Sequence, residues 1–446
     1  MSYNLITNGY QNSATTGSYA TVINGASNKS TGNFSSIING VSNISTSKFS
    51  LSNGNLNSAT TNYYSTVING HQNYASGNKS FIGNGNLNTA NNSFSSVLNG
   101  LHNSAITGSF ATVINGNYNK SSTRHSFIGG GSSNSATTSY YSTIVNGQSN
   151  LSNSRFGFVG NGINNKTVSS YNYATILNGN KNTSNGTHST IINGYNNNIQ
   201  TLECLIGVGS SNRIMFGANG STILAGSNNT IYNYSSSILQ GGANKVGGFN
   251  SSVINGVGNY CNGNQSTIIN GQQNVISRFS NYKTTILGGS FNYITIGSYS
   301  IIAGGTYNTI KSKYSAIING KSNLVRGVFS TIISGSYNSL SGSNSSILAG
   351  SGITSSLSGT AIAQHFGIVT GGTNTSAGVT TLLLGTSTVT TTAAKASSLV
   401  FTSFASVGGT QGFLTSVPTS GSFTITSSNV ADTSKVYWWI VNPANS

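Results

Sequence analysis

The sequence predicts an all-β protein in which a parallel β-solenoid shaft, residues 1–350, precedes an antiparallel β domain, residues 377–446, that forms a tip or a trimerisation cap. The pattern G-x-x-N occurs 22 times between Gly9 and Asn338, with its glycines mostly 15 or 16 residues apart. A short aliphatic segment precedes nearly every one of these glycines. The pattern then stops, and after a transition at residues 351–376 the sequence alternates between polar and apolar residues.

The repeat is typical of stacked coils, in which each unit covers the apolar face of its neighbour. Helical repeats need units of roughly 20 to 45 residues. These units are shorter, and they are rich in Ile, Val, Thr and Tyr, which favour strands. Gly and Asn supply tight turns. We therefore expect about 22 coils, each with one or two short parallel strands.

Two adjacent positions of each repeat are aliphatic. With the glycine as position zero, position −3 is always aliphatic and position −2 usually is. Neighbouring side chains of a strand point to opposite faces, so one row lines the coil and the other needs a second apolar surface. Identical chains arranged in a closed ring supply that surface, and we predict a homotrimer. The residues assigned to these two rows are Ile37, Ile38, Ile191, Ile192, Ile268, Ile269, Ile332 and Ile333.

Three further positions of the repeat, +3, −6 and +5, also predict structural features. The Asn at +3 either forms an amide ladder along the coils or supplies a left-handed turn conformation. Aromatic residues at −6 accompany small residues at +5 in the first half, as Phe94 accompanies Ala90 and Ala105. This pairing suggests an exchange of volume inside the coil, although the last three coils are large at both positions.

Catalytic groups are scarce in this chain. Glu203 and Asp432 are its two acids and stand too far apart to form a carboxylate pair in one coil. His125 and His188 occupy aromatic positions, either as polar replacements or as metal ligands on a trimer axis. Cys261 occupies a +5 position, which predicts a buried apolar role. Hydrolysis and group transfer need a carboxylate, an activated nucleophile or a metal, so we predict no enzyme, no cofactor and no metal.

The charge is positive and dispersed. Charged residues make up 4% of the chain, and its net charge is +16. Spread cations attract anionic surfaces such as lipopolysaccharide, teichoic acid or nucleic acid in a general way. A specific nucleic-acid site would concentrate them in one stripe, so none is predicted. No apolar stretch approaches the roughly 18 residues of a membrane span, and no membrane insertion is expected.

Units of the form S-T-I-I-N-G-x-x-N over residues 5–350 resemble the head repeats of trimeric autotransporter adhesins. Those heads are left-handed parallel β-rolls wound as trimers, and the resemblance implies the same for this shaft. They favour Ala and Ser around an A-I-G core, whereas this chain uses bulkier Ile and Asn.

The C-terminal sequence is similar to a module found at the C-terminus of many phage tail-fibre and virion structural proteins. The matching runs are S-F-T-I-T-S from Ser422, D-T-S from Asp432 and W-W-I from Trp438. Asp432 is expected to accept hydrogen bonds in a turn. Trp438 and Trp439 point to opposite faces of a strand, so we expect one in the core and the other in the core, at an interface or as a platform for a glycan.

Together these features predict a structural fibre of a virus particle, a tail or capsid fibre that contacts the host surface. Its expected partners are its own copies, other virion proteins, and a host glycan or another anionic surface polymer. The chain begins directly in the repeat without a signal peptide, which favours assembly in the host cytoplasm and a place on the virion surface. The alternatives are a bacterial adhesin head and an ice-binding or matrix solenoid, the latter suggested by Thr at −4, as in Thr21 and Thr190.

Overall fold

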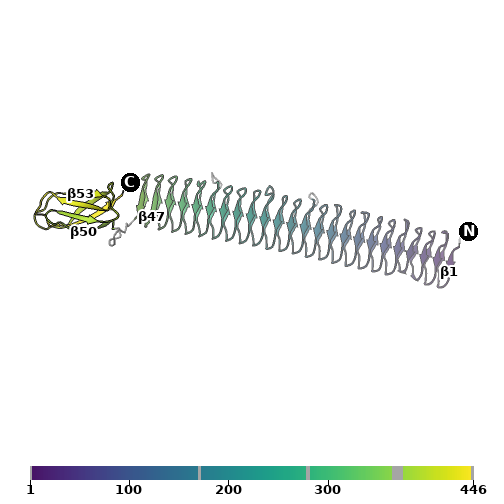
Figure 1. Cartoon of the computed structure of the whole chain (residues 1–446). Helices are drawn as coiled ribbons and strands as arrows, with labels where there is room; N and C mark the ends of the chain where they lie inside the picture. Colours follow the sequence, from purple (N-terminus) through teal and green to yellow (C-terminus); the bar gives the residue numbers. More distant parts are fainter. Residues whose placement is uncertain (1–2, 169–171, 278–281, 364–374, 443–446) are drawn as a thin grey trace. The chain divides into compact units, whose positions relative to one another are not determined.

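The computed structural model describes residues 3–168, 172–277, 282–363 and 375–442, and Figure 1 shows the chain. It divides into two compact units, residues 1–362 and 363–446, which are described separately below. Residues 364–374, the greater part of the transition expected at 351–376, lie outside the described residues.

The first unit is a stack of coils carrying two ladders of short parallel strands (Figure 1). The first ladder runs from β1 (Leu5–Ile6) to β49 (Ala361–Ala363) and has 24 strands among the described residues. The second ladder runs from β2 (Ser13–Ala14) to β48 (Thr354–Ser355). Each strand pairs with its equivalent one coil later, as Leu5 of β1 pairs with Thr21 of β3 (Thr21–Val22). No described residue is helical, and the predicted all-β parallel solenoid is confirmed.

The interior of each coil is filled from both ladders. Positions −5 and −3 point inward from the first ladder, and positions +3 and +5 point inward from the second. The −3 residues Ile37, Ile191, Ile268 and Ile332 have no exposed surface. The +5 residues change from Ala and Ser in the early coils to Ile, Val and Leu in the later ones, and all stay buried.

The Asn at +3 forms a buried ladder along the coils. Asn150 is typical: its Oδ1 accepts the N–H of Asn165 at 3.0 Å, and its Nδ2 donates to the carbonyl of Gly162 at 2.8 Å. The left-handed backbone conformation belongs instead to the preceding residue, Ser149, with φ 55°. Of the two interpretations of this Asn, the amide ladder is therefore the one that the structure shows.

One coil departs from the inward orientation of position −3. The coil from Gly40 to Gly54 is one residue shorter than its neighbours, and its strand β8 (Leu51–Ser52) pairs with β11 (Thr66–Val67). Ser52 lies opposite the buried Val67, so Ser52 points inward and Leu51 is only partly buried. A change of one residue moves a strand's side chains to the other face, which explains the exchange.

The aromatic residues at −6 lie outside the coils, so the expected exchange of volume with +5 is wrong. These residues stand at a corner with positive φ, for example 56° at Phe94, and their rings stack on one another from coil to coil. One uninterrupted stack has ring centroids 4.7–4.9 Å apart and consists of Phe94, Phe110, His125, Tyr141, Phe156, Tyr173 and His188. The two histidines therefore continue a ring stack.

The second unit consists of two three-stranded antiparallel sheets (Figure 1). One has the order β50 (Ala377–Thr381), β55 (Lys435–Val441) and β52 (Leu399–Ser406). The other has the order β51 (Thr386–Thr390), β54 (Ser422–Ser427) and β53 (Leu414–Thr419). Phe423, Ile425, Val436 and Trp438 form the core between them. In the described part of the chain, no helix has the length and apolar character needed to cross a membrane.

Candidate functional sites

The outer face of the first ladder carries a row of exposed aliphatic side chains at position −2. Ile38, Ile192 and Ile333 are 48%, 40% and 42% exposed, and Ile269 is partly buried. We call this row the outer ridge. Its other exposed members are Ile23, Ile68, Leu98, Ile114, Val145, Leu177, Leu224, Leu239, Leu287, Ile318 and Leu348.

Where the outer ridge lacks a large residue at −2, its neighbour at −4 is large, except in the shifted coil of Gly54, where Leu51 at −3 takes the outer face. Four coils have Gly at −2 with Phe or Leu at −4, and a fifth has Ala303 with Ile301. In the coil of Gly83, an added Cβ would lie 3.5 Å from Phe81 Cε1, so the ring occupies the space beside the glycine. The four glycine pairs are Phe81 and Gly83, Phe127 and Gly129, Phe158 and Gly160, and Leu205 and Gly207.

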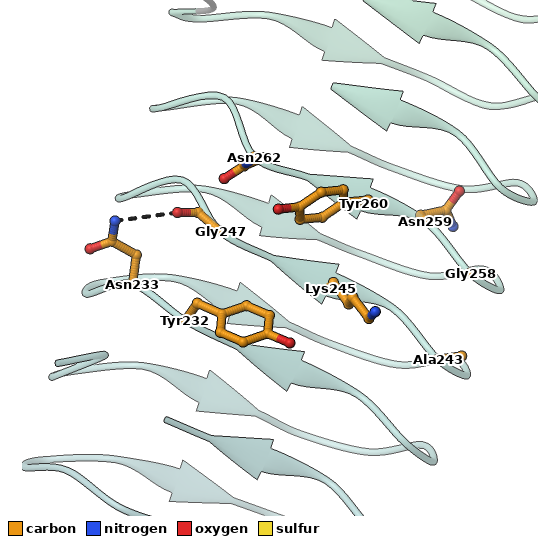
Figure 2. Close-up of a pocket in the computed structure, with 9 residues that line it drawn as sticks. All are labelled: Tyr232, Asn233, Ala243, Lys245, Gly247, Gly258, Asn259, Tyr260 and Asn262. Atoms are coloured by element: carbon orange, nitrogen blue, oxygen red, sulfur yellow. Dashed lines mark hydrogen bonds between the residues drawn. The ribbon is translucent and has the colours of Figure 1, made fainter. Parts of the chain in front are cut away.

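The outer face of the second ladder is hollowed over three successive coils (Figure 2). The hollow has a volume of about 630 Å³, and Tyr232, Lys245 and Tyr260 supply its large side chains. Thr230 of β32 (Thr230–Ile231), Lys245 of β34 (Lys245–Val246) and Tyr260 of β36 (Tyr260–Cys261) are register partners. Tyr232 follows β32 on the same outer face. Ala243, Gly247, Gly258 and the amides of Asn233, Asn259 and Asn262 complete the lining.

Small residues create this hollow. Position +6 has Tyr232 in one coil and Asn262 two coils later, but Gly247 between them has no side chain. A Cβ on Gly247 would lie 2.3 Å from Asn262 Oδ1 and 3.5 Å from Tyr260 Cε2. Position +2 is also small in two adjacent coils, Ala243 and Gly258. Ala243 and Gly258 therefore open the surface on one side of Lys245 and Tyr260, and Gly247 opens it on the other (Figure 2).

The C-terminal unit holds its one acid, Asp432, in a buried turn. Its Oδ2 accepts the Gly412 N–H at 3.0 Å and the Ser427 hydroxyl at 2.7 Å, and its Oδ1 accepts the Ser434 N–H at 3.0 Å. Hydrogen bonding by Ser434, followed by Gly412 and Ser427, holds the pKa of Asp432 well below its usual range, although burial opposes this shift. The ionised carboxylate is thus part of the folded domain.

We expect acid to destabilise this unit through Asp432. Because its folded pKa lies below the unfolded value of about 3.9, its stabilisation is present above that pH and is lost as the pH falls below it. Asp432→Asn should lower stability at neutral pH and flatten the acid dependence. Trp438 and Trp439 are the chain's two tryptophans, so tryptophan fluorescence during unfolding reports on this unit. Glu203→Gln, which removes the other acid, should leave the fluorescence profile unchanged. An unaltered acid dependence in Asp432→Asn would refute the assignment.

The two tryptophans of β55 lie on opposite faces. Trp438 is buried in the core, with its ring edge-on to Phe423, whereas Trp439 is 39% exposed and stacks on Phe401 at 5.2 Å between ring centroids. Beside them is a largely apolar hollow of about 390 Å³ that Val379 and Tyr437 help to line. Gly378 lies against the Trp438 indole, where an added Cβ would stand 2.7 Å from Cζ2.

The cysteines are buried and free. Burial raises the pKa of the Cys261 thiol to about 12, so this group stays protonated at neutral pH. Burial also raises the pKa of Cys204. Neither thiol is therefore set up to act as a thiolate nucleophile.

Comparison with known proteins gives one family. Residues 374–441 match the K1 capsule-specific polysaccharide lyase, C-terminal domain. The matched range covers the antiparallel unit and none of the coils. No match was found among curated proteins.

This match contradicts the prediction that the chain is not an enzyme, because the family is named for a polysaccharide lyase. The scarcity of carboxylates opposes hydrolysis and group transfer, the two reaction classes on which that prediction was based. A lyase instead breaks a bond by elimination, which needs a base for one proton and an acid for the leaving oxygen. Tyr, Lys and His side chains can serve in either role, and such side chains are plentiful in this chain.

The hollow at Tyr232, Lys245 and Tyr260 was not predicted from the sequence. No sequence motif marks this hollow. It becomes visible only when adjacent repeats are aligned, because the small residues at positions +2 and +6 then fall in neighbouring coils. The predicted site residues are dispersed instead. The inner isoleucines line the coil, their outer neighbours form the outer ridge, and Asp432, Trp438 and Trp439 belong to the second unit.

Proposed function

We propose that the chain is a tail-spike or tail-fibre protein of a phage particle, and that it binds a capsular polysaccharide on the host cell. The observation that carries this proposal is the match of residues 374–441 to the C-terminal domain of a capsule-specific polysaccharide lyase. The stack of coils supports it, because a long rigid surface can present many weak binding sites to a polymer. The net charge of +16 also favours an anionic polymer.

Tests with encapsulated bacteria address this function directly. Labelled full-length protein should bind encapsulated cells and lose that binding when the capsule is stripped or competing purified capsule is added. Antibodies against the chain should mark the tails of native phage particles in electron micrographs. Equal binding to cells with and without capsule, across a panel of capsule types, would contradict the proposal.

Cleavage of the capsule by elimination is a second candidate function, favoured by the name of the matched family. Tyr232, Lys245 and Tyr260 offer side chains that can move protons beside a bound chain. Incubation with the capsule should then shorten the polymer and produce the ultraviolet absorbance of an unsaturated sugar. Undiminished chain length for every capsule that the protein binds would exclude this activity and leave binding as the function.

We also propose that the protein works as a homotrimer whose copies pack on the outer ridge. The outer ridge repeats once per coil, so a partner that packs along it needs apolar side chains at the same spacing. Another copy of the chain has that spacing. The exchange between positions −4 and −2, as in Phe81 and Gly83, keeps the outer volume nearly constant. Such compensation is expected of a packed surface and is unnecessary in water. A closed ring of three copies leaves no ridge uncovered.

Replacing one residue of the outer ridge should therefore weaken assembly. Leu98 is 40% exposed in the single chain, and covering this remaining surface would contribute about 0.6–1.2 kcal/mol per copy. Leu98→Ser is expected to raise the concentration at which the trimer dissociates, measured by analytical ultracentrifugation. Asn99→Ser changes the adjacent exposed residue and should leave assembly intact. Equal behaviour of the two variants would contradict packing on the ridge.

A further inference from the structure

The hollow on the second ladder brings together groups that suit one kind of ligand. In Figure 2 the ring of Tyr232, the side chain of Lys245 and the ring of Tyr260 follow one another along three coils. Tyrosine rings present an apolar face on which a sugar can pack, and a lysine ammonium pairs with a carboxylate. The side chains of Asn233 and Asn262, both next to Gly247, supply amide donors and acceptors for hydroxyl groups.

The charge of Lys245 is not balanced by its surroundings. The chain's two acids are Glu203, in an earlier coil, and Asp432, in the C-terminal unit. Several other cations lie over aromatic rings, among them Lys79 over Phe94 at 5.0 Å. Within the described ranges, Lys245 shows neither an ion pair nor such a ring contact. Its exposed ammonium is therefore available to an anion that enters the hollow.

A second cation continues the same surface. Arg213 of β30 (Arg213–Ile214) pairs in register with Thr230, which in turn pairs with Lys245. Arg213 lines a neighbouring hollow of about 300 Å³ with Ser211, Asn228 and Thr230. Two coils separate Arg213 from Lys245, or about 9.6 Å at the usual strand spacing. A polymer with repeated carboxylates can contact both.

We propose that the hollow of Tyr232, Lys245 and Tyr260 binds an acidic sugar unit of a polysaccharide, with the sugar carboxylate at Lys245 Nζ. A further acidic unit of the same polymer reaches Arg213. This inference rests on the proposed capsule-binding function and adds the place on the coils and the acidic class of ligand. The hollow belongs to the second ladder and the outer ridge to the first, so the two surfaces are distinct.

Carbodiimide coupling tests the position of the ligand. The reagent activates carboxylates on an oligogalacturonate or oligosialate probe, and each activated group forms an amide with a nearby lysine amine. Because the protein has two acidic side chains of its own, coupling within the protein is limited. Peptide mass spectrometry of the full chain should find the sugar mainly on Lys245. Labelling spread equally over Lys120, Lys166 and Lys245, or no coupling with either probe, would overturn the proposal.

Matched variants test the affinity. Lys245→Ala should weaken binding of the acidic probe about tenfold or more, as expected for loss of a charged hydrogen bond. Lys120→Ala removes an equal charge at the same strand position outside the hollow and should retain binding. Gly247→Val fills the hollow without changing charge and should also weaken binding, with circular dichroism confirming that the coils remain folded. Tyr260→Ala should weaken binding more than Tyr293→Ala, its counterpart two coils later.

The outcomes separate this inference from the function on which it rests. If the wild type binds capsule and Lys245→Ala and Gly247→Val bind it equally well, the hollow is not the site, but capsule binding stands. If only Trp439→Ala abolishes binding, the ligand lies on the C-terminal unit and the hollow is likewise refuted. If the wild type binds no capsule at all, the proposed function fails as well. Equal affinity for oligogalacturonate and its methyl ester would contradict the acidic class.

Discussion

Gly147→Ala is expected to destabilise the solenoid by about 2–5 kcal/mol, from left-handed strain and overpacking together. Gly147 has φ 107°, and an added Cβ would lie 2.2 Å from the carbonyl oxygen of Gly162 in the next coil. It would also lie 2.4 Å from Asn150 Nδ2 in the amide ladder. At this position the main chains of adjacent coils are in direct contact. Neither coil can move away to make room for a Cβ without breaking hydrogen bonds of the amide ladder.

Denaturation followed by far-ultraviolet circular dichroism measures this effect, because the solenoid dominates the strand content. The matched control is Gly130→Ala one coil earlier, where an added Cβ has Asn146 Oδ1 at 3.6 Å as its nearest neighbour. That variant should unfold within about 0.5 kcal/mol of the wild type. Equal stability of the two variants would show that the glycine column is not closely packed. Tryptophan fluorescence, which reports on the C-terminal unit, should be the same in both.

Asn150→Leu is expected to cost the solenoid roughly 1–3 kcal/mol, because it leaves the buried N–H of Asn165 without its acceptor. Leucine is close to asparagine in size but leaves the Gly162 carbonyl and the Asn165 N–H without their side-chain partner. The Asn165 N–H lies inside the stack, where water cannot replace the amide, whereas the part-buried Gly162 carbonyl keeps the N–H of Gln148. The damage should spread to neighbouring coils, because the stability of a solenoid depends on contacts between adjacent repeats.

Asn146→Leu provides the comparison for this ladder residue. Asn146 belongs to the same coil but is exposed, and its substitution should change the denaturation midpoint little. Hydrogen exchange measured along the chain would locate the effect, with faster exchange in Asn150→Leu centred on the coils of Gly147 and Gly162. If Asn150→Leu were as stable as Asn146→Leu, the amide ladder would contribute nothing to the fold.

The repeat made much of the architecture predictable. A period of 15 or 16 residues with aliphatic side chains at −3 predicts parallel coils with those residues inside, and Ile37 and Ile268 are there. The register of Leu51 and Ser52 was not predictable in the same way, because the glycine pattern persists although the coil is one residue shorter. The outward position of Phe94 and its neighbours also escaped prediction, since it depends on the corner conformation at −6 rather than on hydrophobicity.

The functional surface was less predictable than the fold. Lys245 and Tyr260 stand one coil apart, Tyr232 stands two residues after the register partner of Lys245, and the three share no motif, so only the register of the second ladder shows that they adjoin. The prediction that the chain is not an enzyme failed for a different reason. It relied on the absence of carboxylate pairs, which elimination chemistry does not require, and the similarity of residues 374–441 to the C-terminal domain of a polysaccharide lyase family contradicts it.

Cryo-electron microscopy of the purified full-length chain at side-chain resolution tests the central claim most directly. We predict three parallel stacks of coils with Ile38, Ile192 and Ile333 of each copy packed against the other copies, leaving the hollow at Lys245 open to solvent. A map that showed single stacks at micromolar concentration, with those isoleucines facing water, would contradict the account.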